Sequence, residues 1–239
     1  MVVFEVAGVL FLATIIRSAF GFGEALVAVP LLALAIPVEI AAPVAVLVSI
    51  TVALVVVLQD WRHIHLRSAG RLVLSTLFGI PLGLLMLKVV PEAVVKATLA
   101  VVIIVFSSYS LVRPSHYELK DDRLAWIFGF FAGVMGGAYG INGPPLAIFG
   151  SLRKWAPGHF RATLQGYFLP ASMAGMVGYF FTGLWTPTVN RFYLLSLPAV
   201  IPAIFVGRIL NRRLHPRYFL RIVHVGLIGI GLILLVQAL

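Results

Sequence analysis

Long apolar runs separated by short polar gaps dominate the hydrophobic pattern of the chain. A membrane crossing takes about 20 apolar residues, because the hydrocarbon core of a bilayer is about 30 Å thick. Six runs have this length: 41–58, 71–89, 92–112, 162–183, 192–210 and 218–237. Each of them predicts one transmembrane helix.

Glycine and proline interrupt two further apolar regions near their middles. These regions are 2–36, broken at Gly21-Phe22-Gly23-Glu24, and 124–152, broken at Gly140-Ile141-Asn142-Gly143-Pro144-Pro145. Proline lacks the backbone N–H, and glycine raises the entropic cost of a helix. Both regions are therefore predicted to form broken helical hairpins.

The composition indicates that lipid surrounds most of the chain. Of its 239 residues, 61% are hydrophobic and 11% are charged, whereas soluble domains have about 45–50% and about 25%. So few polar side chains could not cover a water-exposed surface, which excludes a soluble enzyme or binding domain. The chain has no cysteine, which excludes disulfides and thiolate metal sites.

The net charge of +10 comes from basic residues in the gaps between apolar runs. Four gaps, at 59–71, 113–123, 153–161 and 208–221, contain 14 of the 18 Lys and Arg residues. Short basic loops face the cytoplasm, so we expect these gaps on one side, with each hairpin entering and leaving by the same face and both termini outside. The charge also favours anionic lipid headgroups. No basic helix or aromatic-basic motif indicates a nucleic-acid partner.

The chain resembles itself at a shift of 119 residues, which aligns 11–22 with 130–141 and makes the two breaks coincide. Chance similarity between apolar segments is the alternative. Each half then holds one broken Gly-rich helical hairpin plus three transmembrane helices, and the odd number starts the second half on the opposite face. The predicted fold is an all-α polytopic membrane protein with two inverted-topology repeats, as in many secondary transporters.

This division gives a first transmembrane repeat at 1–112, a cytoplasmic linker at 113–123 and a second transmembrane repeat at 124–239. In inverted-repeat transporters the substrate binds near the midplane, where broken helices meet. Backbone N–H groups at the start of a half-helix carry partial positive charge and bind anions. We therefore expect a small anionic substrate at the two breaks.

The candidate substrate-binding residues lie at the breaks and at isolated polar positions in the apolar runs. They are Gly21, Gly23, Glu24, Gly140, Asn142, Gly143, Pro144, Arg17, Arg161, Gln165, Ser49 and Thr51. The glycines would let the backbone approach an anion, and the amides of Asn142 and Gln165 would donate to its oxygens. The hydroxyls of Ser49 and Thr51 have an alternative partner, the carbonyl four residues earlier.

Glu24 is the candidate proton-coupling residue. An ionised carboxylate at the bilayer centre costs at least about 2.5–3.5 kcal/mol, so Glu24 should be paired, hydrated or protonated. Arg17 could hold an anionic substrate through bidentate hydrogen bonds, neutralise Glu24 as a structural partner, or extend to the interface. Arg161, at the start of an apolar run, is either an orienting charge or a site residue.

No metal site and no cofactor are expected. His63 and His65 point to different sides of a helix, since residues two apart do not face each other. Apart from His224, no His, Cys or paired Asp lies at membrane depth to supply a metal cluster or a nucleophile–base pair. An intramembrane enzyme is therefore not expected.

The stretch from Gly21 to Pro30, the second break and Arg161-Ala162-Thr163 resemble the TauE/SafE family, also called the sulfite exporter or toluene-sulfonate uptake permease family. The resemblance covers nearly the whole chain. It implies a multi-pass permease of the plasma (inner) membrane for small sulfur-containing anions such as sulfite, sulfonates or sulfoacetate. The chain departs from the family pattern at Glu24-Ala25 and Asn142, where glycine is common.

We therefore expect a secondary transporter of small sulfur-containing anions, proton-coupled through Glu24, with the anion bound between the two broken-helix motifs. Alternating access would come from rocking one repeat against the other. The alternatives are a transporter of another small carboxylate or inorganic anion, and a non-transporting membrane accessory protein. Membrane lipids are the other expected partners, and the sequence leaves open whether the chain forms a homodimer.

Overall fold

The computed structural model describes residues 2–60, 64–112, 119, 121–155, 157–213 and 216–238. These residues form ten α-helices and no strand. The helices are α1 (Val2–Phe20), α2 (Glu24–Leu32), α3 (Val38–Asp60), α4 (Leu66–Val89), α5 (Glu92–Val112), α6 (Ala125–Tyr139), α7 (Gly143–Leu152), α8 (Pro157–Thr182), α9 (Pro187–Arg213) and α10 (Pro216–Ala238).

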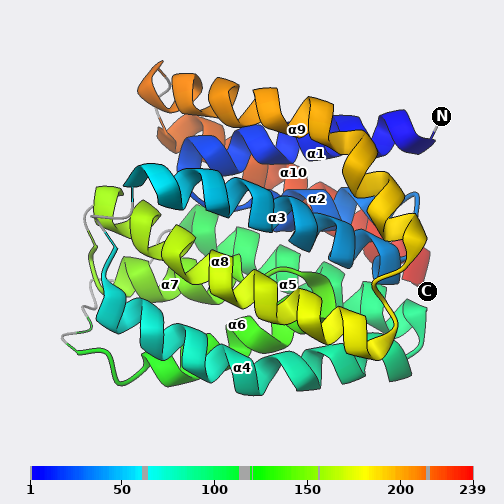
Figure 1. Ribbon diagram of the computed structural model, residues 1–239, viewed down its shortest axis with the longest axis horizontal. Coiled ribbons are helices and arrows are strands. Elements are labelled where there is room, and N and C mark those ends of the chain that lie inside the picture. Colours follow the sequence, from blue (N-terminus) through cyan, green and yellow to red (C-terminus); the bar gives the residue numbers. More distant parts are fainter. Residues whose placement is uncertain are drawn as a thin grey trace.

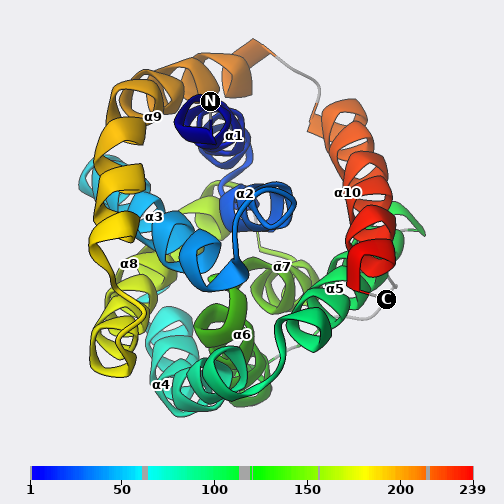
Figure 2. The same ribbon diagram turned by 90° about the vertical axis from the view of Figure 1, so that its right-hand side faces the viewer.

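Both predicted breaks are present, and short helices follow them. The first lies between α1 and α2, the second between α6 and α7. Gly23 (φ +98°) and Gly140 (φ +68°) adopt the left-handed conformation that glycine accepts without steric strain. Figure 2 shows α2 and α7 at the centre of the molecule, surrounded by the longer helices.

The closest helix pairs join the two halves of the chain. Helix α1 packs on α9, α4 on α6, α5 on α10 and α3 on α8. If α1 to α5 are matched in order with α6 to α10, the pair α1–α9 corresponds to α6–α4. The pairs α5–α10 and α3–α8 each correspond to themselves. The main helix pairs are thus unchanged when the two halves are exchanged.

Glycine lets the backbones of α4 and α6 touch. A Cβ added at Gly79 would lie 2.2 Å from the carbonyl oxygen of Phe130, and one at Gly133 would lie 2.4 Å from that of Thr76. Gly83 and Gly137 lie equally close to the opposite backbone. Small residues permit such close approach between helices in membranes.

Five helices of the described part are long and apolar enough to cross a membrane: α1, α3, α4, α5 and α9. Helices α8 and α10 run beside α3 and α5. Large hydrophobic side chains such as Phe78 and Phe181 project outward from this bundle. The chain is therefore a multi-pass membrane protein.

The two ends of the bundle differ in the segments they carry. Both termini lie at the right-hand end in Figure 1. The ends of α3, α5, α7 and α9 and the starts of α4, α6, α8 and α10 lie at the opposite end. These helix ends flank the four basic gaps of the sequence. Of the segment at 113–123, the structure describes residues 119 and 121–123.

Candidate functional site

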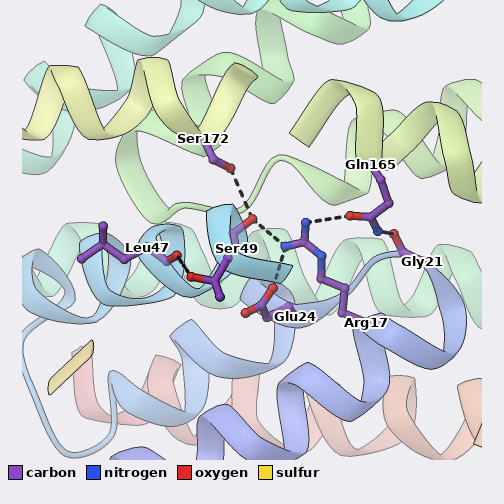
Figure 3. Close-up of polar contacts among 8 residues, drawn as sticks. Arg17, Gly21, Glu24, Leu47, Ser49, Gln165 and Ser172 are labelled. Atoms are coloured by element: carbon purple, nitrogen blue, oxygen red, sulfur yellow. Dashed lines mark hydrogen bonds and ion pairs between the residues drawn. The ribbon is translucent and has the colours of Figure 1, made fainter. Parts of the chain in front are cut away.

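A buried ion pair spans the first break. Arg17 lies in the last turn of α1 and Glu24 begins α2. The side chains are 3% and 1% exposed, and Arg17 Nη1 lies 2.5 Å from Glu24 Oε2. The same nitrogen donates to Ser49 Oγ of α3 at 2.5 Å, and Nη2 donates to Gln165 Oε1 of α8 at 2.9 Å (Figure 3). One guanidinium thus connects four helices.

Further contacts hold the partners of Arg17 in place. Gln165 Nε2 donates to the carbonyl of Gly21 at 2.6 Å, which ties α8 to the first break. The hydroxyl oxygens of Ser49 and Ser172 are 3.2 Å apart and share a hydrogen bond (Figure 3). The guanidinium carbon lies 4.8 Å from the centroid of the Phe168 ring, within range of a cation–π interaction.

Two atoms of the ion pair have no hydrogen-bond partner among the described residues. They are Arg17 Nε and Glu24 Oε1, and both are buried. A buried polar atom without a partner costs about 1–3 kcal/mol, and more when it is charged. These atoms therefore mark a place where water or a ligand oxygen would be stabilised.

A cavity of about 20 Å³ lies against the ion pair. Residues of both breaks line it, including Gly23 and Glu24 from the first and Gly140, Asn142 and Gly143 from the second. A volume of this size holds about one water molecule. This conformation is therefore closed around the site, and a polyatomic anion requires the walls to separate.

The starts of α2 and α7 approach the cavity from the two breaks. Partial positive charge accumulates at each start because the first backbone N–H groups have no helical acceptor. In α2 the residues Glu24, Ala25 and Leu26 all keep their N–H. In α7 the second and third residues are Pro144 and Pro145, which have none. Helix α2 therefore offers more backbone donors than α7.

Asn142 provides the polar side chain of the second break. It is 7% exposed, and its amide covers Gly136, where an added Cβ would lie 2.8 Å from Nδ2. The Asn142 side chain lies near the Tyr167 hydroxyl. The Tyr167 and Thr76 hydroxyl oxygens are 2.6 Å apart, and Thr76 donates to the carbonyl of Gly129. This chain of contacts fixes Asn142 to α6 and α8.

Most of the candidate residues from the sequence come together here. Arg17, Gly21, Glu24, Ser49 and Gln165 share one hydrogen-bond network. Arg17, Glu24 and Ser49 also line the cavity, together with Gly23, Gly140, Asn142 and Gly143. Arg17 and Glu24 form the ion pair that the sequence left as one of several alternatives.

Three candidates are not part of this arrangement. The hydroxyl of Thr51 donates to the carbonyl of Leu47 at 3.2 Å and lies 2.8 Å from the Tyr193 hydroxyl. Pro144 lines a separate apolar groove formed by α5, α6 and α7. The backbone of Arg161 is helical, but its side chain lies outside the described residues.

Sequence reasoning missed two members of the network, Phe168 and Ser172. Both lie on α8, three and seven residues after Gln165, and such spacings place side chains on one face of a helix. Extending the Gln165 face along α8 would have found them. Within the described part of the chain, no group of three or more His, Asp or Glu residues is positioned to hold a metal ion.

Comparison with known proteins agrees with a transport role. The family profile described as Sulfite exporter TauE/SafE matches residues 6–234. The probable sulfite/organosulfonate exporter TauE of Cupriavidus necator is 23% identical over 181 residues, which cover 74% of this chain and 71% of that protein. No solved structure gives a significant match.

Proposed function

Because the chain belongs to the sulfite exporter TauE/SafE family, we propose that it is a secondary transporter of small sulfur-containing anions such as sulfite, sulfonates or sulfoacetate. The family is a transporter family, and the chain is accordingly not an enzyme. The observation that carries the proposal is the buried guanidinium of Arg17 beside a cavity lined by both helix breaks. The anion binds between these breaks.

The chemistry of the cavity suits a sulfur oxyanion. A planar guanidinium donates two parallel hydrogen bonds to a pair of oxygens, as it does with carboxylates and phosphates. The start of α2 adds backbone N–H groups, and Asn142 adds a side-chain amide from the opposite break. A sulfonate or sulfite has three oxygens, so all three sources can act at once.

We also propose that the chain is built from two inverted-topology repeats. The order of a long helix, a break, a short helix and three long helices occurs twice. The main helix pairs are unchanged by exchange of the halves. Helix α1 runs from right to left in Figure 1 and α6 from left to right, as inversion requires.

Alternating access requires two bodies that move around the cavity. The first helix of each repeat packs most closely on a helix of the other repeat. Helix α1 of the first repeat packs on α9 of the second, and α6 of the second packs on α4 of the first. Rocking one whole repeat against the other would separate the glycine contacts of α4 with α6. We therefore propose that α1, α2 and α9 form one body and α4, α6 and α7 the other. The site lies between them, because Glu24 follows α1 and Asn142 follows α6.

The membrane orientation follows from the basic helix ends. Positively charged loops remain in the cytoplasm, so the end of the bundle that carries the four basic gaps faces inward in the plasma (inner) membrane. Cysteine labelling tests this directly, since the natural chain has none. Lys154→Cys should react only with a reagent that reaches the cytoplasm, and Thr188→Cys only from outside. Labelling of both from one side would contradict the orientation.

Uptake of labelled sulfite into proteoliposomes tests the function. Arg17→Gln should abolish uptake, because the cavity loses its cation. Arg191→Gln is the matched control, since this arginine is exposed at the start of α9 and the variant should transport normally. Competition by isethionate, acetate and phosphate then separates a sulfonate transporter from a carboxylate or inorganic-anion transporter. Full transport by Arg17→Gln would overturn the proposed site.

Proton coupling through Glu24 is the second part of this proposal. Glu24 is 1% exposed and lines the cavity, so a proton on it reaches solvent only through the transport path. Replacement by Gln should abolish transport driven by a pH gradient while leaving exchange of anion for anion. Unchanged dependence on the pH gradient would rule Glu24 out as the coupling residue.

A further inference from the structure

We infer that the Glu24 carboxylate occupies the place on Arg17 that the transported anion takes, and that the substrate enters as a monoanion together with one proton bound by Glu24. This inference rests on the proposed function and specifies the ionic form of its substrate. It makes Glu24 an internal stand-in for the anion, which keeps the cation of Arg17 neutralised between transport events.

The contacts of Arg17 divide into those that hold it and the one that can leave. Gln165 and Ser49 are neutral acceptors on α8 and α3, and neither needs to move when Glu24 does. Glu24 sits on the short helix α2, directly after a break with a left-handed glycine. When Glu24 withdraws, Nη1 keeps Ser49 as its acceptor and can donate a second hydrogen bond to a new anion. The Nε–H group, which has no partner among the described residues, can donate to the same anion. The guanidinium stays oriented while it accepts a new anion.

Charge balance sets the ionic form of the substrate. Among the described residues, Arg17 and Glu24 are the charged side chains that line the cavity. Helix α7 contains no ionisable side chain, and the remaining lining is neutral. An uncompensated charge in such a site is strongly unfavourable. A monoanion that replaces an ionised carboxylate, with that carboxyl then protonated, leaves the net charge of the site at zero.

The other described ionisable groups on the helices packed against α2 do not line the cavity. Among the side chains that the structure describes on α1, α3, α5 and α10, they are Glu5, Glu39, Glu92, Lys96, Tyr109 and His224. The side chains of Asp60, Arg217, Tyr218 and Arg221 on α3 and α10 lie outside the described residues. Both Glu5 and Glu39 are exposed, and Lys96 pairs with Glu92 at 3.1 Å. The His224 ring lies 5.8 Å from that of Phe106, away from the cavity lining. The proton is therefore assigned to Glu24.

The proton can be followed through one transport event. A proton from water on the open side binds a Glu24 oxygen and converts the carboxylate to a carboxylic acid, which releases Arg17. The anion binds the guanidinium, the site closes and then opens to the other side. There the anion leaves, Glu24 returns its proton to water, and the ion pair forms again. Each event moves one monoanion and one proton in the same direction, with no net charge.

Calorimetry of methanesulfonate binding tests the inference on the purified full chain. Methanesulfonate stays a monoanion across the pH range used, so any linked proton belongs to the protein. Titrations in buffers of different ionisation enthalpy measure the protons taken up per anion. At pH values where Glu24 is ionised in the anion-free protein, the wild type should take up about one proton for each anion that binds. Its affinity should fall about tenfold for each unit of rising pH there, as expected for one linked proton.

Variants assign the proton and separate the two proposals. Glu24→Gln should bind methanesulfonate without proton uptake and without pH dependence, and the exposed-site control Glu39→Gln should behave as the wild type. Binding by the wild type without proton uptake, together with loss of binding in Arg17→Gln, would overturn this inference and leave the proposed function standing. Absence of binding in folded wild-type protein at every pH would overturn both.

A flux measurement gives an independent check that does not depend on a variant folding. Wild-type uptake of methanesulfonate should be driven by an inward proton gradient and should not change when a potassium diffusion potential is imposed. A rate that responds to the potential would show net charge movement and contradict the one-to-one balance.

Discussion

The two helix breaks meet at one cavity, yet their chemistry differs. The first joins a cation and an anion, Arg17 and Glu24, and the start of α2 keeps its backbone N–H groups. The second contributes the neutral amide of Asn142, and two prolines remove N–H groups from the start of α7. The first break thus holds the charged groups that the proposed mechanism uses, whereas the second offers a neutral wall.

The hairpins also differ in how they pack against the rest of the molecule. Helix α6 touches the backbone of α4 through a row of glycines that includes Gly133 and Gly137. Helix α1 contains a single glycine, Gly8, and an added Cβ there would meet no atom within 4 Å. Among the described residues, the close backbone approach between α1 and α9 is at Gly207, where an added Cβ would lie 2.6 Å from the carbonyl oxygen of Ile15. The neutral break therefore belongs to the hairpin with more glycine contacts to its neighbour, and the charged break to the hairpin with fewer.

Removing the cation of the first break should have the largest effect. Arg17→Gln leaves Glu24 buried without a counter-charge, which should lower the free energy of unfolding by about 3–5 kcal/mol and abolish transport. Thermal unfolding in detergent and proteoliposome uptake measure the two effects. Arg17→Gln/Glu24→Gln should recover most of the stability and none of the transport. A single variant as stable as the wild type would contradict the importance of the pair.

A methyl group in the α4–α6 contact should produce the next largest loss of stability. In Gly133→Ala the new Cβ would lie 2.4 Å from the carbonyl oxygen of Thr76. The helices must move apart, at about 1–3 kcal/mol for an overpacked site. Gly8→Ala is the matched control and should unfold at the wild-type temperature. Equal unfolding temperatures for the two variants would show that the second hairpin is not the more tightly packed one.

Changing the second break should weaken binding without altering the pH response. Asn142→Leu replaces the amide donor by an apolar side chain of similar size. A hydrogen bond to a charged group contributes about 1.5–3 kcal/mol. The affinity for methanesulfonate should therefore fall roughly tenfold to a hundredfold, with proton uptake per anion unchanged. Calorimetry at several pH values measures both quantities. A change in proton uptake would mean that the second break takes part in the protonation step.

The smallest effects should distinguish two hydroxyls on α3. Ser49→Ala removes an acceptor of Arg17 and should lower the affinity several-fold, since such a bond contributes about 1.5 kcal/mol or less when solvent can replace it. Thr51→Val removes a hydroxyl that bonds Leu47 and Tyr193 and should leave affinity within about twofold of the wild type. A larger loss of affinity in Thr51→Val than in Ser49→Ala would mean that Thr51, and not Ser49, belongs to the binding site.

The sequence predicted the parts of the fold that depend on local chemistry. Apolar runs and glycine–proline breaks act within a few residues, so the helix interruptions at Gly21 and Gly140 could be recognised without a structure. The ion pair was one of several alternatives, because Arg17 and Glu24 are near in sequence but separated by the break. Their actual geometry depends on Gly21 and Gly23, whose backbone conformations turn α2 back toward α1.

The remaining contacts depend on packing between distant segments. Ser49 and Gln165 reach the same guanidinium from positions 32 and 148 residues after it. No local pattern determines that α3 and α8 cross at this point. Thr51 illustrates the limit on a smaller scale, since two residues along a helix turn a side chain away from its neighbour. It hydrogen-bonds the carbonyl of Leu47, as isolated hydroxyls in apolar helices commonly do.

The small volume of the cavity has a consequence for the cell. A space of about 20 Å³ accommodates about one water molecule, and one molecule cannot form a continuous file of water across the bilayer. The closed site therefore holds too little water to connect Glu24 to solvent by a continuous file within the cavity. Each substrate would wait for a conformational change of microseconds to milliseconds, so the number of copies in the membrane would set how quickly a cell moves its substrate.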